Sequence, residues 1–417
     1  MCQKKLVNEV GPAVIKDRFF DRIAEINAFI QRLDDAQHVL LIAQRRVGKT
    51  SLMWETAERL GDRYYCLLVD VQECRAPGDA ILEMLKACRP HAGLLTGMLE
   101  VVRFLTARPP DATLALPEDE LIIQLRHALA GDWKHAADKL LGVLAAADLR
   151  VIVFIDEFPL LVNRMLRRGT KEITPEGRSE TELFLSWLRA ATIHFKGHIR
   201  FVVSGSIGLG PILRMAGLSA AVNTFSPMEL GPWDEETAVA CLEALAANYD
   251  LRFGPAATQT AVQRLGCCIP HHVQMLFSLL WQDASRRSTQ MITSADVERV
   301  YQERMLGTRG HAELSHMEER LQQVLDEQDL GLVEDLLSEA ALGHLDDAAV
   351  RFLATASDPD GRTAAGRVSR LLELLEHDGY IRRRGDRYVF VSNLLKDWWQ
   401  ERRRSTYVPV RRRGGRE

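Results

Sequence analysis

The 417-residue sequence predicts an α/β fold: a mostly parallel, doubly wound sheet, then an all-helical region and a C-terminal helical module. Three observations support this prediction. Short apolar segments ending in polar residues recur between helical segments over the first 232 residues. Beyond Pro232 the pattern becomes entirely helical. Close to the C-terminus, an arginine-rich hairpin pattern follows a helix with one apolar face.

The elements of the first region follow in order along the chain. A helix carrying Ile23, Ile26, Ala28 and Ile30 on its apolar face leads into the first strand. The later strands are short and continuously apolar, as expected when both faces are buried. We expect strands at 38–43, 64–71, 151–155 and 199–203, and helices at 50–60 and throughout 77–147, with a stripe of Leu121, Ile122, Leu125, Ala128 and Leu129.

The second region carries apolar residues at helical spacing only. We expect helices at 235–247, 256–265, 271–281 and 294–304, and a longer helical stretch over 312–341. From about Leu330 the order is three helices, a hairpin and a helix. The resulting domain prediction is a core at 1–232, a helical lid at 233–310, a helical linker at 311–329, a C-terminal module at 330–400 and a basic tail at 401–417.

Composition and charge narrow the class of protein. Hydrophobic residues make up 47% and charged residues 26% of the chain, which is typical of globular proteins. The net charge is −4, but the segment from Arg367 onward has fourteen Lys and Arg against seven Asp and Glu. This +7 end on a −11 body suggests a local contact with a polyanion.

Neither a disulfide framework nor a membrane anchor is expected. The seven cysteines contain no Cys-x-x-Cys pair, so we expect free thiols and no zinc site. The N-terminus lacks the apolar core of a signal peptide, and the longest apolar stretch, near 140–149, is too short to cross a bilayer. We therefore expect a cytoplasmic protein.

The segment between the first strand and its helix has the features of a phosphate-binding loop. Ala43-Gln-Arg-Arg-Val-Gly-Lys-Thr50 offers backbone amides and a helix N-terminus to phosphate, a lysine for the β- and γ-phosphates, and a threonine hydroxyl for Mg²⁺. The usual pattern begins with glycine, where this chain has Ala43. Taken alone, the segment also fits a plain strand–turn–helix junction.

Two later strands end in the residues that such a loop requires. Val151-Ile-Val-Phe-Ile-Asp156-Glu157 places Asp156 to hold Mg²⁺ through water and Glu157 to orient and deprotonate the attacking water. In Phe201-Val-Val-Ser204-Gly-Ser206 a sensor of the γ-phosphate is expected, with Ser204 preferred over Ser206. No guanine-reading Asn-Lys-x-Asp element is present, which favours ATP over GTP. Together these segments predict a P-loop NTPase core of the ASCE type.

The motif series resembles the archaeal-type ATPases of the STAND/AAA+ group over roughly residues 14–400. The resemblance rests on Phe19-Phe-Asp-Arg22-x-x-Glu25, Arg45-Arg-Val-Gly-Lys-Thr-Ser51, Ile155-Asp-Glu-Phe-Pro159, Ser204-Gly-Ser-Ile-Gly-Leu209 and Leu230-Gly-Pro-Trp233. It implies that Phe20, Asp21 and Arg22 lie near the adenine and that the helical region forms a lid. It also implies that Pro270 and His271 of the lid approach the nucleotide, although Cys268 replaces the glycine of the usual Gly-x-Pro turn.

The predicted nucleotide site therefore has a defined set of residues. Catalytic roles are assigned to Lys49, Glu157 and Ser204, and Mg²⁺ binding to Thr50 and Asp156. Nucleotide contacts are expected from Phe20, Asp21, Arg22, Arg46, Val47, Gly48, Lys49, Thr50, Ser51 and Pro270. Arg189, Arg200 and Arg214 are alternative arginine fingers, and Arg45 and Arg46 are alternative contacts to a second protomer.

The C-terminal module has the pattern of a winged helix. The helix at 367–378 shows one apolar face, Gly379 ends it, and residues 380–391 form two strands around Gly385-Asp386. Residues 362–391, with wing contacts from Arg382, Arg383, Arg384 and Arg387, and the basic tail could contact DNA. A surface that binds only protein is the alternative.

Three functions remain open from the sequence. The first is a slow ATP-hydrolysing switch that reports its nucleotide state through the winged helix. The second is a DNA-binding ATPase resembling origin-recognition or transposition regulators, and the third is a nucleotide-binding adaptor that hardly hydrolyses. A separate effector protein and homo-oligomerisation are compatible with each of them.

Overall fold

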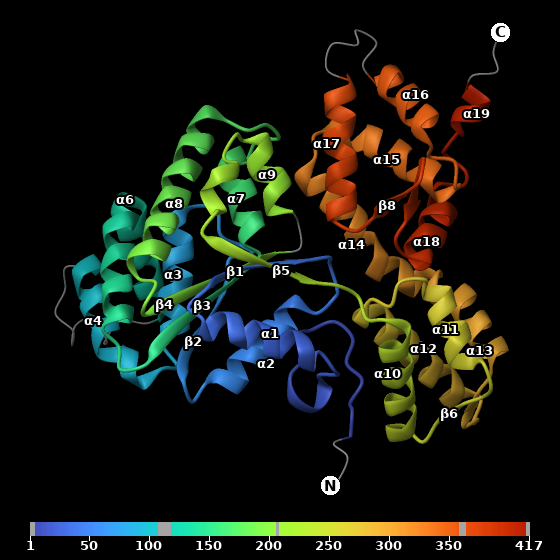
Figure 1. Ribbon diagram of the computed structural model, residues 1–417, viewed down its shortest axis with the longest axis horizontal. Coiled ribbons are helices and arrows are strands. Elements are labelled where there is room, and N and C mark those ends of the chain that lie inside the picture. Colours follow the sequence, from blue (N-terminus) through green and yellow to red (C-terminus); the bar gives the residue numbers. More distant parts are fainter. Residues whose placement is uncertain (1–4, 107–117, 206–207, 358–363, 414–417) are drawn as a thin grey trace. The chain divides into compact units, whose positions relative to one another are not determined.

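The computed structural model describes residues 5–106, 118–205, 208–357 and 364–413 (Figure 1). The chain forms two compact units. Unit 1 consists of Met1–Asp21, Gln44–Gly48 and Gly231–Glu417, and unit 2 consists of Arg22–Ala43 and Lys49–Leu230. The chain therefore leaves unit 2, enters unit 1 and returns within the predicted phosphate loop.

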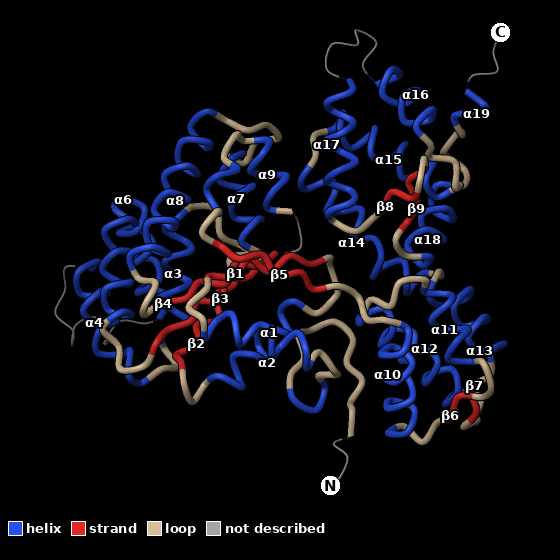
Figure 2. Tube along the Cα trace, viewed as in Figure 1, coloured by secondary structure: helices blue, strands red, loops and turns tan. Residues whose placement is uncertain are grey.

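Unit 2 is built on a five-stranded parallel sheet with the order β2-β3-β4-β1-β5 (Figure 2). The strands are β1 (His38–Ala43), β2 (Tyr64–Asp70), β3 (Arg150–Asp156), β4 (Ile199–Gly205) and β5 (Phe225–Leu230). The first four lie where apolar runs of the sequence predict strands. Because β4 lies between β3 and β1, the carboxyl ends of these three strands are neighbours at one edge of the sheet.

Strand β5 was not predicted from the sequence. Pro227 and Glu229 interrupt its apolar pattern, and Pro227 cannot donate a hydrogen bond to a neighbouring strand. In the structure β5 pairs with β1 alone and forms the edge of the sheet. Proline is tolerated at an edge because one side of the strand has no partner.

Helices cover both faces of this sheet. They are α1 (Ile23–Asp34), α2 (Lys49–Leu60), α3 (Pro77–Cys88), α4 (Ala92–Thr106), α6 (Glu118–Ala145), α7 (Phe158–Arg167), α8 (Pro175–His194) and α9 (Leu209–Met215), with the short 3₁₀ helix η2 (Ser219–Val222). In Figure 1, α1 and α2 lie on one face and α7, α8 and α9 on the other. The predicted helical stretch 77–147 is divided into α3, α4 and α6, and residues 107–117 lie outside the described part.

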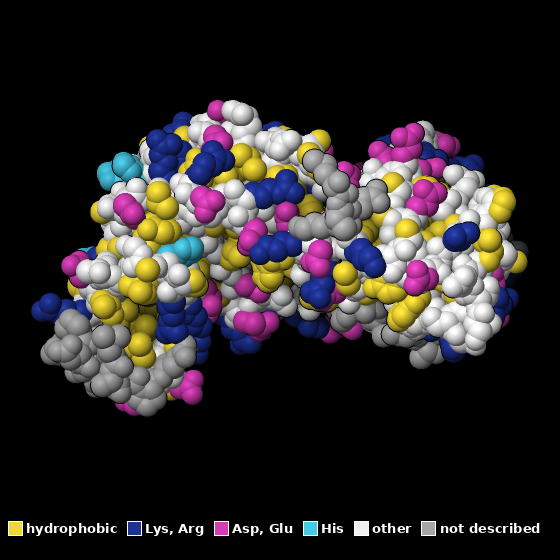
Figure 3. Space-filling view, turned by 90° about the horizontal axis from the view of Figure 1, so that it is seen from below, with side chains coloured by type: hydrophobic (Ala, Val, Ile, Leu, Met, Phe, Trp, Pro, Cys, Tyr) yellow, Lys and Arg dark blue, Asp and Glu magenta, His cyan; other side chains and the backbone are white. Residues whose placement is uncertain are grey.

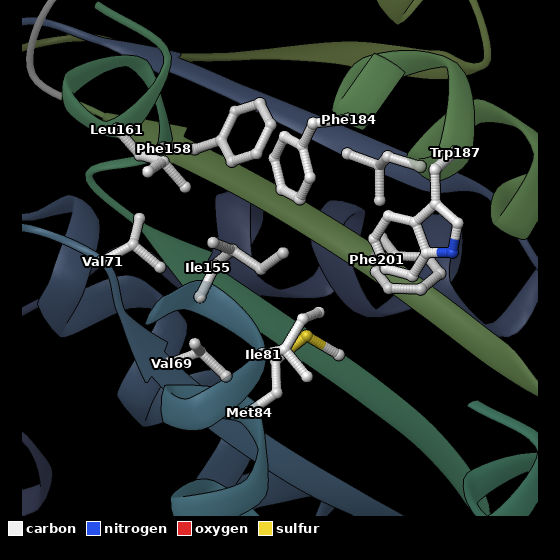
Figure 4. A pocket seen from close by; sticks show the side chains of 12 residues that line it. Val69, Val71, Ile81, Met84, Ile155, Phe158, Leu161, Phe184, Trp187 and Phe201 are labelled. Carbon is white, nitrogen blue, oxygen red and sulfur yellow. The ribbon is translucent and has the colours of Figure 1, made fainter. Parts of the chain in front are cut away.

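The side chains of β3 point alternately to the two faces of the sheet. The ring of Phe154 contacts Phe29 of α1 edge-on, with 6.1 Å between ring centroids. The next residue, Ile155, points to the other face and packs with Val69 of β2 and with side chains of α3, α7 and α8 (Figure 4). The gap between these side chains is about 10 Å³ and entirely apolar, so the layer is closely packed and dry.

Unit 1 begins with a group of helices around its own core. It contains α10 (Glu235–Asn248), α11 (Ala257–Leu265), α12 (Pro270–Arg286), α13 (Ser294–Val300) and the π-helical turn η3 (Tyr301–Met305), with the short parallel strands β6 (Arg252–Phe253) and β7 (Met291–Ile292). Helix α10 begins where the Asp234 carboxylate accepts a hydrogen bond from Thr237 N at 2.7 Å. The N-terminal segment, with η1 (Lys16–Arg18), belongs to this unit, and Asn8 donates to the Gln274 carbonyl at 3.0 Å.

The remainder of unit 1 is a helical module with a hairpin. Its elements are α14 (Thr308–Val324), α15 (Glu327–Ala341), α16 (Asp347–Ser357), α17 (Ala364–His377), the antiparallel strands β8 (Ile381–Arg384) and β9 (Arg387–Phe390), α18 (Asn393–Arg403) and α19 (Val410–Arg413). The prediction of one helical stretch over 312–341 was wrong at Leu325, which is extended. A new helix, α15, then begins, and the Asp326 carboxylate caps it by accepting a hydrogen bond from Asp329 N at 2.8 Å. Such a cap satisfies one of the backbone donors that the first turn of a helix leaves without a partner.

Hydrogen bonds join the two parts of unit 1. Tyr301, which is fully buried, donates its hydroxyl to Asp397 of α18 at 2.9 Å. The Asn393 side-chain amide donates to the Gln263 carbonyl of α11 at 3.0 Å. Among the described residues, every helix is too short or too polar to cross a lipid bilayer.

Candidate active site

The loop between β1 and α2 contains two residues with left-handed backbone. Arg46 has φ of +69° and Gly48 has φ of +95°. Glycine adopts this conformation without steric cost, whereas arginine does so only under constraint. Ala43 is not among the described residues with positive φ. The chain can therefore carry alanine where the usual phosphate-loop pattern has glycine, because this position makes no special backbone demand.

Lys49 is the first residue of α2 and is only 6% exposed. Its ammonium nitrogen lies 3.4 Å from the Ala43 carbonyl oxygen at the end of β1, so the side chain folds back across the loop. A buried ammonium beside the start of the loop is suited to a phosphate ligand. Val47 and Ser51, the neighbours of this segment in the prediction, are also buried.

Asp156 joins three elements of unit 2 through one carboxylate. Its Oδ2 accepts from the Thr50 hydroxyl of α2 at 2.6 Å, and its Oδ1 accepts from the Ser204 hydroxyl of β4 at 2.5 Å. Oδ1 also accepts from the backbone N–H of Glu157 at 3.0 Å. Residues from three distant segments of the sequence are thereby brought together at the carboxyl edge of the sheet.

Glu157 lies between β3 and α7 in a left-handed conformation, with φ of +57°. A non-glycine residue in this region costs free energy and is frequent at functional sites. The Glu157 side chain does not cap α7, although the residue occupies the capping position. Glu157 directly follows Asp156, so two carboxylates stand next to each other at the end of β3.

Asp70 is an acidic residue at the same sheet edge that the sequence did not lead us to assign. It ends β2 and pairs with Asp156 in the register of the parallel strands. Partial desolvation, together with the neighbouring Asp156 and Glu157 carboxylates, raises the pKa of Asp70, although its side chain still reaches water. The signal was present in the sequence, because the predicted strand 64–71 is also an apolar run that reaches a carboxylate.

The donor set fits a magnesium ion bound together with a nucleotide. Thr50, Asp156 and Glu157 offer only hydroxyl and carboxylate oxygens, which are the ligands that Mg²⁺ prefers. Within the described residues no three His, Cys, Asp or Glu side chains form a ready cage for a metal. Mg²⁺ bound with a nucleotide keeps several waters and takes phosphate oxygens as further ligands, so it needs few ligands from the protein.

The remaining predicted residues of unit 2 lie as follows. Ser206, the second choice for a sensor, lies outside the described residues. Arg22 is buried and its guanidinium pairs with Glu25 at 2.7 Å. Arg200 is 1% exposed at the amino end of β4, where it donates to the Leu33 carbonyl at 2.9 Å. Arg189 is exposed on α8, and Arg214 lies in the last turn of α9.

Unit 1 holds the other predicted nucleotide contacts. The Phe20 ring meets Trp233 edge-on at 5.8 Å between centroids, and the next residue, Asp21, has φ of +56°. Pro270 opens α12, where its missing N–H is harmless. The following backbone N–H, of His271, donates to the Arg46 carbonyl of the loop at 3.4 Å.

A second contact within unit 1 joins the loop to the C-terminal module. Gly379, which ends α17, has φ of +76°. A Cβ added there would lie 2.2 Å from the side-chain amide carbon of Gln44. The Gln44 side chain therefore packs directly on the Gly379 backbone. The left-handed φ and this close approach each require glycine at position 379.

Many arginines of the C-terminal module are already paired with acids. Arg367 of α17 pairs with Asp329, and Arg383 of β8 lies 3.4 Å from Asp347. Other pairs of unit 1 are Arg402 with Glu318 at 2.6 Å, Arg403 with Glu318 at 3.0 Å and Arg413 with Asp335 at 2.8 Å. On the face of the molecule in Figure 3, basic and acidic side chains are likewise interspersed.

Comparisons with known proteins agree with this architecture. No protein-family model and no curated protein matches the sequence. Among solved structures, the chain is similar to a Walker-type ATPase of Pyrococcus abyssi, with a TM-score of 0.60 and 18% identity over 94% of this chain and 99% of that one. It is also similar to the Aeropyrum pernix ORC2 protein in ADPNP–ADP complexes, with a TM-score of 0.54 and 12% identity over 94% and 98% of the two chains. The chain thus has the fold of a P-loop NTPase.

Proposed function

We propose that this protein is an ATP-binding and ATP-hydrolysing P-loop switch of the STAND/AAA+ kind, whose nucleotide state is coupled to a C-terminal winged helix. The observation that supports the proposal most strongly is the Asp156 carboxylate, which accepts from both Thr50 and Ser204. Phosphoryl transfer needs a metal-binding hydroxyl, a carboxylate and a polar group near the phosphates. Thr50 at the start of α2, Asp156 of β3 and Ser204 of β4 supply these groups at one edge of the sheet.

Each residue has a role that follows from its position. Lys49 releases the Ala43 carbonyl and donates to the β- and γ-phosphates. Thr50 and Asp156 hold Mg²⁺, which neutralises charge on the phosphate oxygens when bound. Glu157 orients a water molecule and accepts its proton, and Ser204 donates to a phosphate oxygen. Mutation of each of these residues tests the role proposed for it.

Coupling is supported by contacts inside unit 1. The loop residue Arg46 accepts from the His271 backbone at the start of α12, and Gln44 packs on Gly379 at the end of α17. A change in loop conformation on nucleotide binding would therefore act on both the helical lid and the C-terminal module. Such a response makes the enzyme a switch, in which ordering by nucleotide and release on hydrolysis change the state of a distant element.

Steady-state ATP hydrolysis tests the enzyme proposal. We expect Lys49→Ala to weaken ATP binding by about tenfold or more, because it removes the buried cation. Glu157→Gln should retain binding and lower the hydrolysis rate by about 10²-fold or more, since it removes the base. An unchanged, negligible rate in both wild type and Glu157→Gln, with ATP still bound, would replace the hydrolytic switch by a nucleotide-binding adaptor.

The winged helix has two candidate partners, DNA and protein. DNA is favoured by Arg370, Arg382 and Arg384, which are exposed and form no ion pair with a described residue. They lie on α17 and β8, the elements that enter a groove and touch phosphate in winged helices. Contact with DNA would make the protein an ATPase of the origin-recognition kind, with nucleotide licensing DNA binding.

Salt-dependent binding to a DNA duplex decides between these partners. The double variant Arg382→Ala/Arg384→Ala should weaken DNA binding and lower the slope of log K against log salt by about 2, one for each phosphate contact. Arg383→Ala is the matched control, because its guanidinium already faces Asp347. Wild-type binding that does not respond to salt would exclude the nucleic-acid contact and leave the protein partner.

A further inference from the structure

Strands β2 and β3 bring a second carboxylate beside the proposed magnesium ligand. Their register pairs Val69 with Ile155 and Asp70 with Asp156. Val69 and Ile155 both line the apolar layer against α3, α7 and α8 (Figure 4). Because side chains alternate along a strand, Asp70 and Asp156 both point to the opposite face. That face carries α2, from which Thr50 reaches Asp156.

The backbone holds Asp70 in place without using all of its carboxylate. Its Oδ1 accepts from the Gln72 N–H at 2.8 Å, which forms a local turn after the strand. The Val71 N–H donates to the Asp156 carbonyl at 3.1 Å, so the strand pairing persists to the last residue. Adjacent strands lie about 4.8 Å apart, which sets the approximate spacing of the two Asp residues. Asp70 remains exposed to water.

We infer that Asp70 is a positioning residue that, with Asp156, holds the water shell of nucleotide-bound Mg²⁺. This role rests on the proposed function, since it requires ATP at the loop. Mg²⁺ dehydrates reluctantly and is often held by one or two carboxylates, with several waters retained. Asp70 and Asp156 end paired strands and point to the same face of the sheet, so both carboxylates can accept hydrogen bonds from metal-bound waters. The sequence motifs assigned Thr50 and Asp156 to the metal, but not Asp70.

A purely structural role for Asp70 makes a different prediction, and one substitution separates the two. Asp70→Asn keeps a side-chain oxygen that can accept from Gln72 N–H and so preserves the turn. It removes the negative charge that attracts the hydrated cation. If Asp70 serves only the turn, Asp70→Asn should behave as wild type. If Asp70 positions the metal, the dependence on Mg²⁺ should change while the fold is retained.

The experiment is a magnesium titration of binding, with a fluorescent ATP analogue as the probe. We expect Asp70→Asn to raise the Mg²⁺ concentration at half-saturation about tenfold, while binding of the analogue in EDTA is not weakened. Asp70→Glu, which restores the charge, should recover most of the wild-type response. Asp62→Asn is the matched control, because Asp62 is exposed in the turn before β2, at the other end of that strand.

The outcomes separate this inference from the function on which it rests. A wild-type protein that binds no ATP analogue at any Mg²⁺ concentration contradicts the proposed function. A wild type that binds, with Asp70→Asn and Asp62→Asn showing the same Mg²⁺ dependence, overturns the role of Asp70 alone. An equal defect in Asp70→Asn and Asp70→Glu also overturns it, because charge would then not be the cause. Thermal melting without ligand verifies that each variant is folded.

Discussion

Gly205 shows how a single residue fixes the position of a site group. It ends β4, directly after Ser204, and a Cβ at this position would lie 2.3 Å from the Cδ of Pro159 in α7. The end of β4 is thus in close contact with the first turn of the helix that follows Glu157. Glycine is required by this close approach rather than by its backbone angle.

We predict that Gly205→Ala destabilises the protein by about 1–3 kcal/mol, the usual cost of an extra methyl group in a packed site. ATP hydrolysis should fall as well, because β4 must shift and Ser204 moves with it. Urea unfolding measures the change in free energy. Gly197→Ala is the control, since a Cβ there meets nothing within 4 Å. Equal stability of the two variants would show that the contact with Pro159 imposes no constraint.

His38 is a second residue with a defined expectation, here in its dependence on pH. Its Nε2 donates to the Thr192 carbonyl at 2.8 Å and its Nδ1 accepts from the Phe201 N–H at 3.0 Å, so the ring is neutral. Burial, reinforced by Lys196 and Arg200, lowers the pKa of His38. The neutral ring therefore contributes stability above pH 6.5, the unfolded pKa, and this contribution is lost as pH falls towards the folded pKa.

We predict that the free energy of unfolding falls between pH 7 and pH 5 with a His38 contribution of at most about 1.4 kcal/mol per pH unit. His38→Asn, which does not titrate, should remove this contribution and flatten the slope. Urea unfolding at several pH values measures the difference between wild type and variant. The exposed His198, replaced in the same way, should leave the slope unchanged. Parallel curves for wild type and His38→Asn would contradict the prediction.

At the scale of elements, local sequence patterns predicted the strands and helices whose bounds depend mainly on neighbouring residues. Buried strands such as β1 and β3 are continuous apolar runs because neither face meets water, and they were predicted within one residue of their bounds. Edge strand β5 was missed because an edge tolerates Pro227, and the break at Leu325 was missed because apolar spacing continues across it. Strand order and register depend on distant segments, so the pairing of Asp70 with Asp156 was not accessible from local pattern.

The contact between α18 and η3 leads to a prediction about the elements of unit 1. Tyr301→Phe removes the hydroxyl that donates to Asp397 and should destabilise unit 1 by about 1–2 kcal/mol, because the donor is fully buried and the acceptor is a carboxylate. If this contact transmits the nucleotide state from the proposed lid to the proposed winged helix, the effect of ATP on DNA or partner binding should also weaken. Calorimetry measures the first effect and binding with and without ATP the second.

Tyr388→Phe is a suitable comparison for Tyr301→Phe. Tyr388 is buried in β9, and its hydroxyl makes no hydrogen bond to a described residue. Loss of that hydroxyl should therefore cost less than about 0.5 kcal/mol. If both variants lose the same stability, the Tyr301–Asp397 bond is not a specific link between the helices of the lid and the C-terminal module.

At the scale of the whole molecule, chain connectivity is the relevant feature. Unit 2 supplies β1 and α2, whereas the residues between them, Gln44–Gly48, belong to unit 1. The chain passes from unit 2 into unit 1 and back again within these few residues. A ligand that binds the loop therefore binds the segment that connects the two units along the chain. Binding to the native state alone then raises the stability of the folded chain by mass action.

We predict that ATP with Mg²⁺ at 100 times its Kd stabilises the protein by about 2.7 kcal/mol, visible as a rise in the midpoint of thermal unfolding. At the same ATP concentration, Lys49→Ala should be stabilised by about 1.4 kcal/mol or less, because losing the buried ammonium weakens binding about tenfold or more. ATP in EDTA should give a smaller rise than ATP with Mg²⁺, because Thr50 and Asp156 then lack the cation that they would share with the phosphates. GTP should stabilise less than ATP at equal concentration. A midpoint that responds equally to ATP in wild type and Lys49→Ala would mean that nucleotide binds elsewhere, and the loop would then lose its assigned function.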